Sequence, residues 1–71
     1  MIRAPHIPAD HPDRGIACQE ALSAYFNWLA DTARDAGWSD DEVAAALAML
    51  AECEFMSVEA NRQLMKELAA L

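Results

Sequence analysis

The chain has 71 residues, a net charge of −7 and a hydrophobic fraction of 55%. A chain of this length forms one small domain, which buries only about 60 to 65% of the surface that its unfolded form exposes. Such domains commonly need a disulfide, a metal, regular helix packing or oligomerisation for additional stability. The negative charge repels nucleic acids and anionic lipid surfaces, which argues against both as partners. We therefore expect a protein partner or self-association.

The first 13 residues contain all three prolines and show no hydrophobic periodicity. This composition predicts a flexible arm, followed by a single helical domain over residues 14–71. The arm lacks the apolar segment of a secretory signal, and no part of the chain approaches the run of about 18 apolar residues that a membrane span requires. We expect a cytoplasmic protein in which Cys18 and Cys53 are reduced.

The first helix is predicted over residues 14–36, because apolar side chains recur on one side of it at helical spacing. Glu20, Asn27 and Asp31 lie on the opposite side. Asp13 or one of its neighbours is expected to cap the beginning of this helix. The apolar side consists of Cys18, Leu22, Tyr25, Phe26, Leu29, Ala33 and Ala36.

The segment from Gly37 to Glu42 ends the first helix and begins the second. Gly37 suits the left-handed backbone conformation that follows many helices. Ser39 can cap the next helix through its hydroxyl group, while Glu42 lies three residues later and can reach back to the Ser39 amide in a capping box. The carboxylates in the first turn also interact favourably with the helix dipole.

The second helix is predicted over residues 40–54, with an apolar side of Val43, Ala46, Leu47, Leu50 and Cys53. From Val43 onwards, the chain repeats at alternating spacings of four and three residues, as in a coiled coil. One continuous helix would place Glu54, Ser57 and Asn61 in the middle of this seam.

A turn near Phe55 and Met56 removes these polar residues from the seam, with Ser57 as a new N-cap. The third helix is then predicted over residues 58–70, led by Ala60, Leu64, Leu68 and Leu71. The predicted fold is an all-α, antiparallel three-helix bundle. The alternative is a hairpin of two helices that dimerises into a four-helix bundle.

The corner resembles that of ubiquitin-associated (UBA) domains, in which a glycine-aromatic loop precedes an acidic helix start and an alanine-leucine pair. The matching residues are Gly37-Trp38, Asp41-Glu42-Val43 and Ala46-Leu47. The resemblance covers about half of the chain and implies a compact three-helix arrangement. The expected glycine turn between the second and third helices is missing, so ubiquitin binding does not carry over.

Aromatic and sulfur-containing side chains exceed what one narrow apolar stripe on each helix can bury. Trp28 lies beside Tyr25 at the edge of the first helix, and widens its apolar arc to roughly 160° from the usual 100° or so. Methionine and tryptophan are favoured at adaptable interfaces. The predicted interaction surface consists of Tyr25, Trp28, Met49, Phe55, Met56 and Met65.

No catalytic motif is present, and no histidine outside the arm can act as a base for a serine or a thiol. The sequence therefore predicts neither an enzyme nor a cofactor site. An alternative hypothesis is a metal- or thiol-dependent sensor that uses His6, His11, Cys18 and Cys53. None of these residues follows a recognised ligand spacing, so we expect the arm histidines to be solvated.

Overall fold

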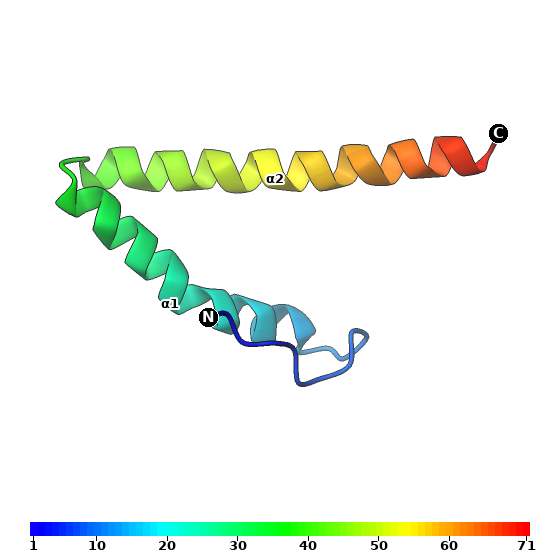
Figure 1. Cartoon of the computed structure of the whole chain (residues 1–71), viewed down its shortest axis with the longest axis horizontal. Coiled ribbons are helices and arrows are strands. Elements are labelled where there is room, and N and C mark those ends of the chain that lie inside the picture. Colours follow the sequence, from blue (N-terminus) through cyan, green and yellow to red (C-terminus); the bar gives the residue numbers. More distant parts are fainter. The chain divides into compact units, whose positions relative to one another are not determined.

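The computed structural model describes residues 1–71 and contains two helices and no strand. Helix α1 spans Arg14–Asp35 and helix α2 spans Asp40–Ala69 (Figure 1). The chain consists of two compact units, Met1–Trp38 and Ser39–Leu71. The all-α prediction is confirmed at this level.

Two hydrogen bonds characteristic of a Schellman motif end α1. The Trp38 amide donates to the Ala33 carbonyl oxygen over 3.3 Å, and the Gly37 amide donates to the Arg34 carbonyl oxygen over 3.0 Å. They satisfy carbonyl groups that have no partner further along the helix. Gly37 has a φ of 113°, a conformation that side chains of L-residues rarely adopt. The predicted role of Gly37 is confirmed.

A complete capping box begins α2. The Glu42 amide donates to Ser39 Oγ over 3.2 Å, and the Ser39 amide donates to Glu42 Oε1 over 3.1 Å. Both bonds satisfy amides that precede the first intrahelical hydrogen bonds. The predicted start of the second helix is thereby confirmed.

The beginning of α1 differs from the prediction. Asp13 occupies the N-cap position, but its side chain makes no capping hydrogen bond. His11 Nδ1 instead accepts a hydrogen bond from the Asp13 amide over 3.0 Å, and the His11 amide donates to the Pro8 carbonyl oxygen. The guanidinium of Arg14 donates to the Ile7 carbonyl oxygen over 2.5 Å. These local bonds fold the last part of the arm onto the start of α1.

The predicted three-helix bundle is not confirmed, because α2 continues without a break through Phe55, Met56 and Ser57. No glycine or proline lies between residues 40 and 69 to favour a turn. The prediction assumed that a continuous helix would bury Glu54, Ser57 and Asn61. All three are exposed in the structure, so the desolvation cost that argued for a turn does not arise.

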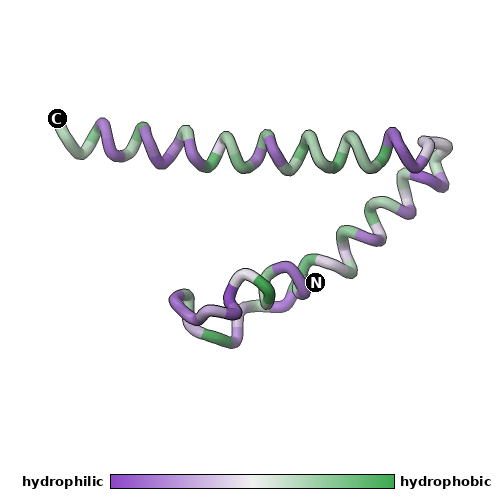
Figure 2. The backbone as a smooth tube through the Cα atoms, turned by 180° about the vertical axis from the view of Figure 1, so that it is seen from behind, coloured by the Kyte–Doolittle hydropathy of each residue, from purple (hydrophilic) through white to green (hydrophobic).

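The predicted core is largely uncovered. Ala30 and Val43 are the only buried residues, with 5% and 4% of their surface exposed. The large apolar residues expected in the core of α1 are exposed, and in α2 Leu47 is half-buried whereas Leu50 is 65% exposed. Figure 2 shows hydrophobic and hydrophilic segments alternating along both helices. Both helices therefore present apolar side chains to solvent.

We expect Gly37→Ala to lower the free energy of unfolding by about 1 to 2 kcal/mol, because alanine is strained at this positive φ. Gly15→Ala is the matched control, since a methyl group at that helical position meets no atom within 4 Å. This control should be stabilised by about 0.5 to 1 kcal/mol. Urea denaturation at one fixed protein concentration measures both effects. Equal effects of the two substitutions would contradict the assigned conformation of Gly37.

Candidate interaction surface

On α1, the predicted surface is an exposed edge formed by Tyr25 and Trp28. These two side chains line an open hollow together with Ala24, and Trp28 is 65% exposed. The Thr32 hydroxyl lies one turn further on and donates to the Trp28 carbonyl oxygen over 2.7 Å. Because this bond satisfies the hydroxyl donor within the helix, the edge can contact an apolar surface at little cost in desolvation.

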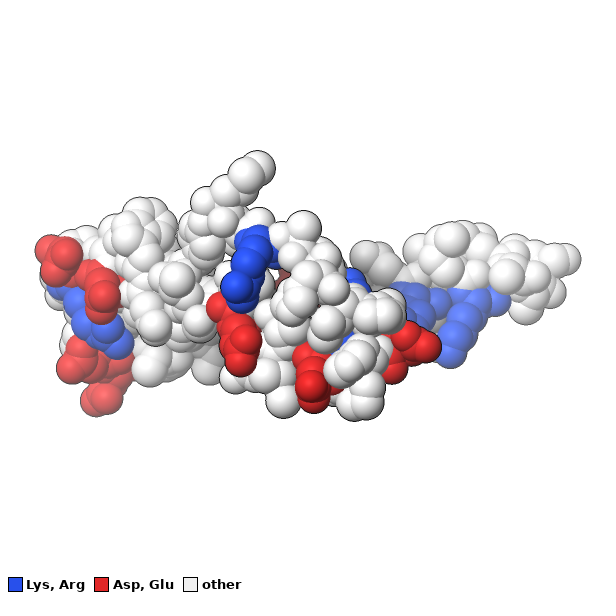
Figure 3. All heavy atoms as spheres, turned by 90° about the horizontal axis from the view of Figure 1, so that it is seen from below, with Lys and Arg blue, Asp and Glu red and all other residues white.

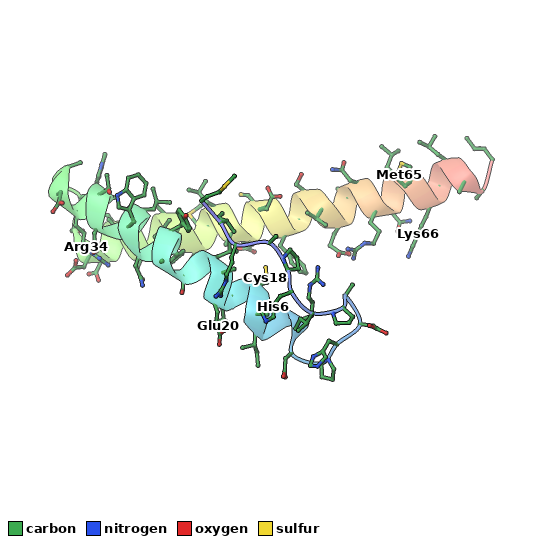
Figure 4. All side chains as sticks on the ribbon, turned by 60° about the horizontal axis from the view of Figure 1, so that its bottom comes forward. His6, Cys18, Glu20, Arg34, Met65 and Lys66 are labelled. Carbon is green, nitrogen blue, oxygen red and sulfur yellow. The ribbon has the colours of Figure 1, made fainter.

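On α2, the predicted residues are exposed but do not form one patch. Met49 and Met56 are two turns apart and lie on nearly the same side of the helix. Phe55 lies about 100° from Met56 around the helix axis. Met65 lies on a third side, and Figure 4 shows it projecting in a different direction from Lys66. The α2 residues therefore belong to several surfaces.

Four leucines that were predicted to be buried share one side of α2, in two pairs separated by Glu54, Ser57 and Asn61. Leu50, Leu64 and Leu68 are 65%, 52% and 54% exposed. They lie on one side of α2 because their spacings follow the repeat of four and three residues. That repeat was the signal for this surface, but it was interpreted as a buried seam within one chain. We call Leu47, Leu50, Leu64 and Leu68 the leucine face.

The charges of α2 are distributed unevenly along its length. Its first turn contains three acidic residues, Asp40, Asp41 and Glu42. The only cations of the second unit, Arg62 and Lys66, lie near the other end. Figure 3 shows acidic and basic side chains next to one another in several places on a larger uncharged surface.

Glu42 is the titratable group with a shifted pKa. Its pKa lies below the ordinary value of 4.5, mainly because the backbone amide of Ser39 donates to the carboxylate, and the Ser39 side chain adds to the effect. Arg62 contacts Glu59 over 2.6 Å one turn earlier. This exposed ion pair contributes little to stability but holds the guanidinium against the helix.

The residues of the sensor hypothesis lie in several places. His6 and Cys18 line a hollow of about 220 Å³ between the arm and α1, where Figure 4 shows both side chains. His6 and His11 line a second hollow of about 340 Å³. Cys53 lies on α2, and both thiols are free and exposed. No group of three or more potential ligands is arranged to hold a metal ion.

Comparisons with known proteins identify no relative. No protein family, curated protein or solved structure matches the chain. Neither α1 nor α2 contains a stretch that is long and apolar enough to cross a bilayer.

We expect the helicity of α2 to fall in acid as Glu42 is protonated. Because the folded-state pKa is lowered, the stabilisation is fully present above about pH 4.5 and is lost as the pH falls through that lower pKa. Glu42→Gln lacks the titrating group, so its helicity should change less between neutral pH and about pH 3. Circular dichroism of both chains measures the difference. Identical titration curves would contradict a contribution from the Glu42 carboxylate.

We expect Trp28→Ala to weaken association, because the indole is largely exposed. At concentrations where both chains are fully associated, the helicity of the variant should equal that of the unsubstituted chain. Asn27→Ala is the matched control, as it alters the adjacent exposed residue without removing apolar area. Sedimentation velocity and circular dichroism at equal concentrations measure the two properties. A large loss of helicity in Trp28→Ala alone would show that the side chain supports the fold.

Proposed function

We propose that this protein is a small, acidic, non-catalytic interaction or regulatory module, whose helices acquire their packing from another protein surface. The observation that supports the proposal is the burial of only Ala30 and Val43 within the chain. Apolar side chains on both helices remain available for contact.

Energetic magnitudes support the need for a partner surface. Fixing the backbone of one residue costs about 1 to 2 kcal/mol, and α1 and α2 order 22 and 30 residues. Full burial of one large aliphatic side chain stabilises the folded state by only about 1.5 to 3 kcal/mol. Ala30 and Val43 are too few and too small to stabilise the pair of helices by themselves. In proteins, most helix stability comes from packing of the apolar side.

The exposed surface has the chemistry of a protein interface. The leucine face supplies aliphatic area, while Tyr25 and Trp28 supply aromatic contacts that often dominate binding energy. The methionines of α2 can adapt to differently shaped partners. The surrounding carboxylates keep the chain soluble and disfavour acidic partners. This combination fits recognition of another helical, apolar surface.

The proposal predicts that the chain alone is incompletely ordered when dilute. Between about 1 µM and 500 µM, helicity should increase with concentration, or increase when a partner is added, because binding stabilises the folded form by mass action. Circular dichroism and thermal unfolding at each concentration measure this dependence. A fully helical monomer that unfolds cooperatively, with a midpoint independent of concentration, would contradict the proposed function.

A further inference from the structure

One hollow in the first unit has a charge opposite to that of the whole chain. Residues 2–6 of the arm lie beside the first turns of α1 (Figures 1 and 4), and together they border a space of about 220 Å³. Arg3, His6 and Arg14 line this space, whereas no Asp or Glu residue does. The chain has 12 Asp and Glu residues and only five Lys and Arg residues. Two guanidinium groups gathered without a carboxylate therefore favour an anion as occupant.

Arg14 lies at the base of the hollow and has unused donors. The residue is half-buried, and its guanidinium donates one hydrogen bond, to the Ile7 carbonyl oxygen. A guanidinium carries five N–H donors, and arginine is rarely removed from water without a partner of opposite charge. No carboxylate of the chain forms an ion pair with Arg14. Its remaining donors are available to the oxygens of a ligand.

The arm contributes the second guanidinium. Arg3 makes no hydrogen bond or ion pair within the chain. His6 lines the same hollow and can donate from a ring nitrogen. Because Arg3 and Arg14 belong to separate segments, they can approach one carboxylate from different directions. Their planar guanidinium groups match the geometry of a carboxylate, with two parallel hydrogen bonds from one group.

The rest of the lining is mainly aliphatic. Ala17 and Ala21 lie one turn apart on α1 and are both half-buried, and Ile2 and Leu22 add larger apolar side chains. Apart from the Cys18 thiol, no further polar side chain is present to bind a second polar group. The volume of about 220 Å³ is smaller than the roughly 300 Å³ at which sites for drug-sized ligands begin. The hollow suits a small ligand with one charged group and a short apolar chain.

The neighbouring hollow of about 340 Å³ lacks this charge pattern. Asp13 and Glu20 line it together with His6 and His11. Glu20 lies two residues after Cys18 and is therefore about 200° away from it around the axis of α1. The carboxylates nearest in sequence thus border a different space, and they leave the guanidinium groups of the first hollow unpaired.

We propose that the first hollow binds a small aliphatic carboxylate. The carboxylate oxygens accept hydrogen bonds from Arg3 and Arg14, and the aliphatic chain lies against Ala17 and Ala21. Burial of the chain adds to the affinity in proportion to the apolar area removed from water. This inference goes beyond the proposed interaction function, because none of these residues belongs to the leucine face or to the edge formed by Tyr25 and Trp28.

Protection of Cys18 from alkylation tests the site, with Cys53 as an internal control. Both thiols are free and exposed, but only Cys18 lines the hollow. The full chain is treated with iodoacetamide at several hexanoate concentrations and constant ionic strength, and mass spectrometry measures the rate at each thiol. We expect half-saturation on the order of 1 mM, as for other very small ligands. At about 10 mM, the Cys18 rate should fall about tenfold and the Cys53 rate should not change.

Two further compounds separate the charge from the aliphatic chain. Hexanol has the chain without the carboxylate, and inorganic phosphate has negative charge without the chain. Neither should protect Cys18 at about 10 mM, because each makes only part of the proposed contacts. Equal protection by hexanol would overturn recognition of the carboxylate, and equal protection by phosphate would overturn the role of the aliphatic chain.

Arg3→Gln tests the guanidinium directly, because it removes the charge without removing a hydrogen bond within the chain. Half-saturation by hexanoate should rise by about tenfold or more, since hydrogen bonds between charged groups are lost. Arg34→Gln is the matched control, as it removes the same charge near the other end of α1 and should leave half-saturation unchanged. Equal protection in the Arg3→Gln chain, or no protection of Cys18 in the unsubstituted chain, would overturn the site. Neither result alters the concentration dependence of helicity on which the proposed interaction function is tested.

Discussion

The ends of the two helices depend on a short set of local hydrogen bonds between Ala33 and Glu42. The Schellman bonds stop α1 at Asp35, and the capping box starts α2 at Asp40. Each bond satisfies a backbone group that a helix end would otherwise leave unpaired. Because the partners are at most five residues apart, these interactions form without a tertiary core. They explain how a chain with so few buried side chains has well-defined helix boundaries.

The helix ends at the corner between α1 and α2 were also predicted best from the sequence. Gly37, Ser39 and Glu42 have the roles expected from their types and spacing, and both ends of α1 lie within one residue of the prediction. The start of α1 was less predictable: the Asp13 side chain makes no capping hydrogen bond, and the His11 imidazole accepts from the Asp13 amide, which lies before the first turn. A rule based on residue preferences favours Asp13 as a cap, but it does not specify whether the carboxylate reaches the amides of the first turn.

The third helix was wrongly predicted because the argument assumed that the seam of α2 is buried within one chain. Glu54, Ser57 and Asn61 disfavour a continuous helix only if they lose water on folding. Their exposure removes that cost, and the helix-forming residues around them then determine the local structure. The same assumption placed Leu50, Leu64 and Leu68 in a core. Periodicity identifies which residues share a side of a helix, but it does not specify what covers them.

The distribution of charge along α2 affects both the start of the helix and the kind of surface that can dock on it. The carboxylates of the first turn support the start of the helix through its amides and dipole, independently of any partner. They also make that end the least favourable place for a second acidic surface to dock. A partner that covers the leucine face must therefore bring positive or neutral groups to Asp40 and Asp41.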